Sequence, residues 1–359
     1  AIPIALTNVP ELVLWWDSDN LIYGRGNNPY DLSRITGGSS GGEAALIAAY
    51  GSVVGVGSDI GGSIRIPSMC CGVFGHKTSP GVIPTDAMYP PPCNGWKPYL
   101  SFGPLCRYTC DIIPMIKAMA GSKADQLKLD EPVDLRKIKI YFMHDDTGNP
   151  LNSPVDPEIT ESMNAALKHF ENKYGVETVR LDFKEMMNAF EYWIFSLKSG
   201  DSYTLTSELN LRRSKINPVI ELLKSLVNYS NHTRTLLVLA CLELFSPDDN
   251  SKYSTQVLKE ADNLKHKFLQ VLGNNGVFFY PTLPIPAVKH KTTIFNGFNC
   301  SYAMVFNILG FPATHCPTGL SKKNIPIGFQ VVAAPFNDRL TIAVASELEK
   351  LLGGWVTPT

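Results

Sequence analysis

The chain has 359 residues, of which 44% are hydrophobic and 18% charged, a composition typical of a globular enzyme and unlike that of a disordered segment. Its formal net charge is −1 and it has no long basic run, which argues against a nucleic-acid binder that must neutralise many phosphates. No internal repeat or disordered linker divides the chain, so we expect residues 1–359 to form a single domain with a large core.

The start of the chain is apolar from Ala1 to Leu6 and is expected to be part of a strand. Because the chain begins without methionine, we also expect a further segment before it. A helix is predicted from Glu43 to Tyr50 by its alanine and leucine content, with Ser39 or Ser40 as its cap. The β-branched run from Val53 to Val56 predicts a short buried strand after this helix.

Later elements alternate between strand and helix, which predicts an α/β architecture with a partly parallel sheet. The clearest helix begins at Asp156 and Pro157, an N-cap carboxylate followed by proline, and ends at Gly175. The other expected elements are strands near 138–143, 179–181 and 327–332, an aromatic run at 278–280, mostly helix from 184 to 272, and a final helix at 339–352.

Eight cysteines are scattered through the chain without a C-x-x-C pair, and no histidine cluster accompanies them. This pattern favours reduced thiols over a zinc site, and we expect neither a metal nor an organic cofactor. The longest apolar run, from Leu236 to Cys241, is too short to cross a bilayer.

Two glycine-rich loops that each contain serine stand at the two ends of the predicted helix–strand unit, Gly37–Gly42 and Asp59–Ser63. A helix and a strand that run back along each other return the chain near its start, so the two loops can meet. Glycines let consecutive backbone N–H groups approach a ligand, and such a nest can stabilise a developing oxyanion. A serine at the end of the nest can attack a carbonyl, which is the arrangement that acyl transfer needs. The candidate amides are those of Ile60, Gly61, Gly62 and Ser63.

The two loops resemble the signature of the amidase signature family, in which GGSSGGE and D-I-G-G-S-I-R-x-P place two serines 24 positions apart, as Ser39 and Ser63 are here. The resemblance implies that Ser63 is the nucleophile, that Ser39 relays its proton and that the Gly38–Ser39 peptide is cis. It also implies that the four candidate amides form the oxyanion hole. The fold implied is an α/β/α domain with a large, mixed, twisted sheet covered by helices. Further matching phrases lie at 8–11, 23–25, 28–31, 75–77, 280–282, 310–313 and 326–330, and the resemblance is weakest between about 145 and 270.

Several phrases are most similar to family members that hydrolyse fatty-acid amides, so the implied substrate is a small-molecule amide, a lipid amide above all. By the same resemblance Val13 lies in an apolar pocket beside the serine loops, and the mostly helical region 145–270 lines the substrate side. Fatty-amide relatives often carry an N-terminal membrane anchor, which here would precede Ala1. For the oligomeric state, a homodimer is one option. For the cellular location, an intracellular membrane surface is one option.

The chain departs from the family pattern at the catalytic base. The family uses a lysine on a strand well before the first serine loop, and the 38 residues before Ser39 contain no lysine. Lys77 follows Ser63 and matches a different, structural position. We therefore expect the lysine upstream of Ala1 and the chain alone to be inactive.

The same residues allow other interpretations. Ser39 and Ser40 each match G-x-S-x-G, but the preceding residues make a poor strand for an α/β-hydrolase elbow, and no Gly-Lys-Ser/Thr follows that would indicate a phosphate loop. Asp59 and Arg65 are expected to brace the loops, and His315 to be a core residue.

The aromatic stretch from Phe190 to Phe195 favours a packed helix face over an acyl channel. The alternative functions are a polar-amide hydrolase, the glutaminase-type subunit of a transamidating complex, and a binding-only paralogue without catalysis.

Overall fold

The computed structural model describes residues 2–86, 88–89, 91–199, 203–245 and 251–358. Its centre is an eight-stranded sheet in the order β5-β7-β6-β11-β12-β10-β8-β9. Neighbouring strands are antiparallel except that β8 pairs in parallel with both β10 and β9, so the sheet is mixed, as predicted. The strands are β5 (Val54–Asp59), β6 (Phe74–Lys77), β7 (Ser101–Cys106), β8 (Lys139–Phe142), β9 (Thr178–Arg180), β10 (Gly276–Pro281), β11 (Ala313–Leu320) and β12 (Pro326–Ala333).

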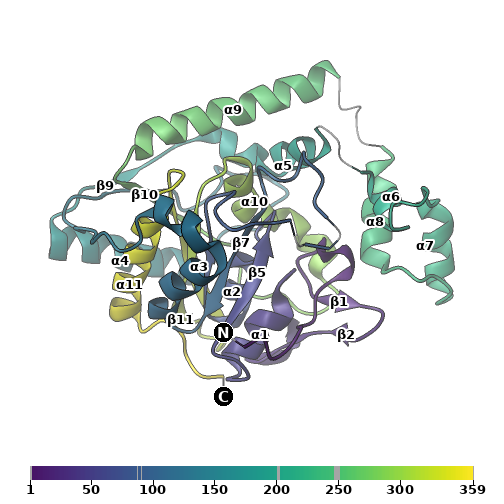
Figure 1. Ribbon diagram of the computed structural model, residues 1–359, viewed down its shortest axis with the longest axis horizontal. Helices are drawn as coiled ribbons and strands as arrows, with labels where there is room; N and C mark the ends of the chain where they lie inside the picture. Colours follow the sequence, from purple (N-terminus) through teal and green to yellow (C-terminus); the bar gives the residue numbers. More distant parts are fainter. Residues whose placement is uncertain (1, 87, 90, 200–202, 246–250, 359) are drawn as a thin grey trace.

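Helices cover both faces of this sheet, which gives the three-layer α/β/α fold (Figure 1). Strand β10 shows the two faces directly, because Phe279 belongs to one buried apolar cluster and its neighbours Phe278 and Tyr280 to another. The first cluster includes side chains of α1, α2, α3, α4 and α11, and the second those of α5, α9 and α10. The helices are α1 (Gly41–Ala48), α2 (Arg65–Cys71), α3 (Ile112–Ala120), α4 (Pro157–Tyr174), α5 (Ala189–Lys198), α6 (Leu205–Glu208), α7 (Pro218–Leu226), α8 (Arg234–Glu243), α9 (Lys252–Leu272), α10 (Ser301–Ile308) and α11 (Asp338–Leu352).

The helix predicted from Asp156 forms as its sequence requires. The Asp156 carboxylate accepts a hydrogen bond from the amide of Glu158 at 2.9 Å, and Gly175 ends α4 in the left-handed conformation.

The strand predicted over residues 1–6 is wrong: residues 2–10 have no regular structure, and Ile2, Ile4 and Leu6 are exposed. An apolar segment does not form a strand unless it pairs with another strand, and none of the described strands pairs with residues 2–10.

Helices α6, α7 and α8 lie beside the main body, on the right of Figure 1, and bury a small apolar cluster of their own. Leu12 and Leu14 pack against that cluster from the short 3₁₀ helix η1 (Glu11–Val13) and the residue after it. The single-domain assignment of residues 1–359 stays a prediction. Among the described residues, no helix combines the length and the apolar composition that crossing a membrane requires.

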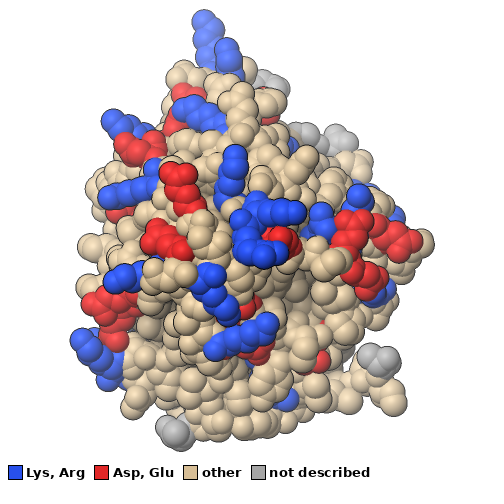
Figure 2. All heavy atoms as spheres, turned by 90° about the vertical axis from the view of Figure 1, so that its left-hand side faces the viewer, with Lys and Arg blue, Asp and Glu red and all other residues tan. Residues whose placement is uncertain are grey.

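The molecular surface carries both signs of charge. On the face shown in Figure 2, Lys and Arg side chains lie among Asp and Glu side chains, with no large area of one sign. This distribution agrees with the near-zero net charge of the chain and offers no continuous basic track on that face.

Candidate active site

The first serine loop is held against the segment Trp15–Ser18. The hydroxyl of Ser18 donates to the carbonyls of Gly37 and Ser39 and accepts from the amide of Gly41. Gly38 must be glycine, because a Cβ there would lie 2.6 Å from the carbonyl oxygen of Trp15. The Gly38–Ser39 peptide is cis, as the resemblance implied.

Ser39 is completely buried, and its hydroxyl has no hydrogen-bond partner among the described residues. Buried hydroxyls normally have a hydrogen-bond partner, so Ser39 is an exception in the described part of the chain.

The second serine loop runs from the end of β5 to the start of α2. Ser63 stands just before α2 and is partly exposed, so the residue predicted to be the nucleophile is open to solvent. The amide of Ser40 donates to the carbonyl oxygen of Ser63 at 3.2 Å, which brings the two loops together as predicted.

Asp59 and Arg65 form a fully buried ion pair that braces the second loop, the role expected for them. The Asp59 carboxylate accepts from Arg65 through two nitrogens and from the amides of Gly62 and Ile64. Burial alone would raise the pKa of Asp59, but the charge and hydrogen bonds of Arg65 outweigh burial and hold this pKa at about 2. Asp59 is therefore ionised at neutral pH and cannot act as a general acid.

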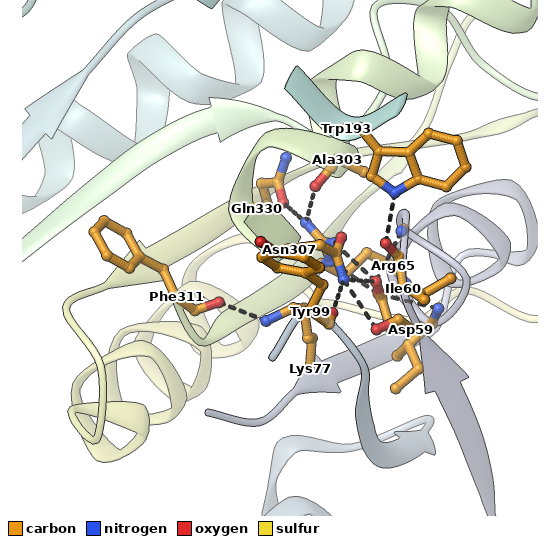
Figure 3. Close-up of polar contacts among 12 residues, drawn as sticks. Asp59, Ile60, Arg65, Lys77, Tyr99, Trp193, Ala303, Asn307, Phe311 and Gln330 are labelled. Carbon is orange, nitrogen blue, oxygen red and sulfur yellow. Dashed lines mark hydrogen bonds and ion pairs between the residues drawn. The ribbon is translucent and has the colours of Figure 1, made fainter. Parts of the chain in front are cut away.

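The network extends to α10 and β12 (Figure 3). Arg65 donates to the carbonyl of Ala303 and to the side chains of Gln330 and Asn307. Asn307 in turn donates to both the backbone carbonyl and the carboxylate of Asp59. Every donor around the buried charge pair has an acceptor, so the loop that carries Ser63 is rigidly held.

The four predicted oxyanion amides are not equivalent. The amide of Gly62 donates to Oδ1 of Asp59 at 2.7 Å, so it is already satisfied. For the amides of Ile60, Gly61 and Ser63, no acceptor is found in the described part of the chain. Gly62 has φ of +109°, and a Cβ there would lie 2.6 Å from Cβ of Ala303, so glycine is required for the shape of the loop.

Val13 lies in η1 and is half-buried, with a left-handed φ of 59° that is unusual for a β-branched residue. Its neighbours Leu12 and Leu14 pack on the α6–α8 cluster, whose buried and partly buried members do not include Val13. Its role in substrate binding stays a prediction.

The aromatic stretch of α5 divides between two environments. Tyr192 and Phe195 are buried in the core, as the packed-face interpretation predicted. The ring of Phe190 lies 4.7 Å from that of Phe298. Trp193 is half-buried and reaches the second serine loop, where its indole N–H donates to the carbonyl of Ile60 at 2.7 Å (Figure 3).

His315 is a buried core residue, as predicted, and its Nδ1 shares a hydrogen bond with the hydroxyl of Thr282. Burial, aided by the charge of Arg65, lowers its pKa to about 3, so the ring is neutral. The second ring nitrogen, Nε2, has no partner among the described residues.

Lys77 is also fully buried, and its Nζ donates to the carbonyl of Phe311 at 2.8 Å. Burial and then the Arg65 charge lower its pKa to about 7. In the described residues no hydrogen bond joins Lys77 to Ser39 or Ser63, which agrees with the structural position assigned to it.

Sequence reasoning missed three contributors to the site, Ser18, Trp193 and Asn307. Each acts through a hydrogen bond to the backbone of a serine loop, and none belongs to the loops themselves. The only available signal was that Ser18 lies near the first loop in sequence. Nothing in the sequence around Trp193 or Asn307 indicates their partners.

All eight cysteines are free. Among the described residues, no group of three or more His, Cys, Asp or Glu side chains is arranged to hold a metal ion.

The fold and the paired serine loops define a hydrolase of the amidase class, and comparison with known proteins places the chain there. The Amidase family profile matches residues 1–342, and the chain belongs to this family, the amidase signature family.

Among individual proteins, the chain is similar to human fatty-acid amide hydrolase 2, with 44% identity over 100% of this chain and 68% of the relative. It is 42% identical to zebrafish (Danio rerio) fatty-acid amide hydrolase 2-B, again over 100% of this chain and 68% of the relative. Of solved structures, a bacterial aryl acylamidase of the amidase signature family superposes with a TM-score of 0.76 at 21% identity, covering 97% of this chain and 72% of that one. At that identity the superposition establishes the fold alone.

Proposed function

We propose that this chain is the catalytic part of a serine amidase that hydrolyses carboxylic amides, fatty-acid amides in particular, through an acyl intermediate on Ser63. The observation that carries the proposal is the meeting of the two serine loops. The Ser40 amide bonds to the Ser63 carbonyl, and unsatisfied backbone amides lie beside the partly exposed Ser63. A hydroxyl next to free N–H donors is suited to attack a carbonyl and to stabilise the oxyanion that results.

In the proposed reaction, Ser63 Oγ attacks the amide carbonyl carbon and passes its proton to Ser39. Amides of Ile60, Gly61 and Ser63 stabilise the oxyanion, while Gly62, although also predicted as a donor, holds the loop through Asp59. Ser39 then returns a proton to the leaving amine as the C–N bond breaks. Water hydrolyses the ester on Ser63 and completes the cycle.

The base in this proposal is a lysine that accepts the proton of Ser39 and precedes Ala1 in the complete protein. Support comes from the buried Ser39 hydroxyl, which lacks a partner among the described residues. Strand β5 also forms one edge of the sheet and, among the described strands, pairs only with β7. A strand that carries the lysine could pair along this free edge. The 359 residues alone are therefore proposed to be inactive.

The fatty-amide substrate is supported by relatives at 44% and 42% identity that are named as fatty-acid amide hydrolases. The rings of Phe190 and Phe298, whose centroids lie 4.7 Å apart, offer apolar surface to an acyl chain, and the Phe190 centroid lies 6.5 Å from that of Trp193 at the second serine loop. Membrane association, through a segment before Ala1, and dimerisation are proposed only as properties of the complete protein.

The test is hydrolysis of oleamide and acetamide by the protein expressed from its full gene, with Ser63→Ala beside it. We expect rapid oleamide turnover, weak acetamide turnover and a loss of at least about 10³-fold in the variant. Activity on acetamide or glutamine alone would retain the amidase and reject the lipid substrate. Undiminished turnover by Ser63→Ala would reject the nucleophile.

A further inference from the structure

Each oxyanion amide is oriented by a hydrogen bond to the carbonyl oxygen of the same peptide unit. In a planar trans peptide, the C=O and the N–H point in opposite directions, so a hydrogen bond to the carbonyl fixes the direction of the amide. The carbonyl of Asp59 accepts from Asn307 at 2.9 Å, which orients the N–H of Ile60. The carbonyl of Gly62 accepts from the amide of Ile66 at 2.7 Å, which orients the N–H of Ser63.

The third peptide, between Ile60 and Gly61, is held by Trp193. The indole Nε1 donates to the Ile60 carbonyl at 2.7 Å, at the short end of the normal range (Figure 3). The indole also covers Gly61 closely, since a Cβ at that position would lie 3.1 Å from Nε1. No other donor to the Ile60 carbonyl is found in the described part of the chain.

Helix α5, which carries Trp193, is packed into the core. Tyr192 and Phe195, on either side of Trp193 in sequence, are buried in the core cluster that also contains α9 and α10. Trp193 thus connects a packed helix, 130 positions from the nucleophile in sequence, to the loop that carries Ser63.

We propose that Trp193 is a positioning residue of the active site, whose indole N–H aims the Gly61 amide at the oxyanion. The inference rests on the proposed function of Ser63. Because the oxyanion exists only in the transition state and the tetrahedral intermediate, Trp193 acts on kcat and leaves KM nearly unchanged. Losing an oxyanion donor outright costs about 10²–10³ in rate, so loosening one donor is expected to cost about tenfold.

Two substitutions separate the hydrogen bond from the ring. Trp193→Phe keeps an aromatic ring and removes the donor. Trp193→His removes the six-membered ring of the indole. It keeps a five-membered ring with an N–H in nearly the position of the indole N–H. In the full-length protein with oleamide, we expect kcat to fall about tenfold in the Phe variant, with KM within about twofold of wild type. We expect the His variant to recover most of that loss above pH 7, where imidazole is neutral.

Trp96 provides a matched control. Its indole N–H also donates to a backbone carbonyl of α5, that of Leu197 at 3.0 Å. Trp96→Phe therefore removes the same kind of bond, and we expect wild-type kcat from it. Melting temperatures of all variants show whether they fold. If Trp193→Phe does not fold, Trp193→Met replaces it as the variant without a donor.

The outcomes separate this inference from the proposed function. Equal kcat for wild type and Trp193→Phe, or equal losses in the Phe and His variants, would overturn the role of the indole N–H while Ser63→Ala remains inactive. A wild-type protein without amidase activity, or an active Ser63→Ala variant, would overturn the proposed function and this inference with it.

Discussion

Asp59 shows how a single buried carboxylate can hold the shape of a loop, here the second serine loop. It binds Arg65, accepts from two loop amides and is itself held by Asn307. Breaking such a pair by removing one partner leaves an uncompensated buried charge, so Asp59 and Arg65 act as one structural unit. Lys77 lies close enough for the charge of Arg65 to help lower its pKa.

Lys77 gives a pH-dependent prediction at the residue scale. Folding lowers its pKa from 10.5 to about 7, so between these values the unfolded chain binds a proton that the folded chain does not. The unfolding free energy should therefore rise with pH from about 7 to about 10, by an amount on the order of a few kcal/mol. Urea unfolding of wild type and Lys77→Met across this range measures the effect. The difference between the two should change with pH; a constant difference would contradict the lowered pKa.

At the scale of elements, η1 contacts the α6–α8 helices and closely precedes the segment Trp15–Ser18, which holds the first serine loop. The Glu11 carboxylate accepts from the backbone amide and the hydroxyl of Thr233, the N-cap residue of α8, and bonds to the ring of His232. Among the described residues, the Thr233 side chain accepts no capping bond from a first-turn amide, and Glu11 instead holds the N–H and hydroxyl of this N-cap residue from a distant part of the chain. A carboxylate at a helix N-terminus is also favoured by the helix dipole.

Removing this contact should loosen α8. We expect Glu11→Ala to ease local opening of the first turn of α8 by about 1–2 kcal/mol, seen as faster hydrogen exchange at the amides from Leu237 onward, the first that bond within the helix. Asp156→Ala, which removes the N-cap of α4, is the control and should leave exchange in α8 unchanged. Unchanged exchange in the Glu11 variant would show that the contact does not stabilise the helix.

Across the whole molecule, the sequence predicted what depends on local chemistry. The start of α4 was predictable because Asp156 and Pro157 are a local N-terminal signal. A strand was also predictable near the valines between glycines, but its predicted burial was wrong: β5 is an edge strand, and Val53 and Val56 are exposed. The helix–strand unit between Ser39 and Ser63 was enough to predict that their loops can meet. The contacts of Trp193 and Asn307 were not predictable, because each joins the second serine loop to a helix more than 100 positions away in sequence.

The most direct test of the account is to find which residue reacts with a fluorophosphonate, a reagent that phosphonylates activated serine hydroxyls. Mass spectrometry of the protein expressed from its full gene should place the label on Ser63. Labelling should disappear in Ser63→Ala and slow by about 10² or more in the 359-residue chain alone, for lack of its base. A label on any other residue, or equal labelling of Ser63→Ala, would contradict the assignment of the nucleophile.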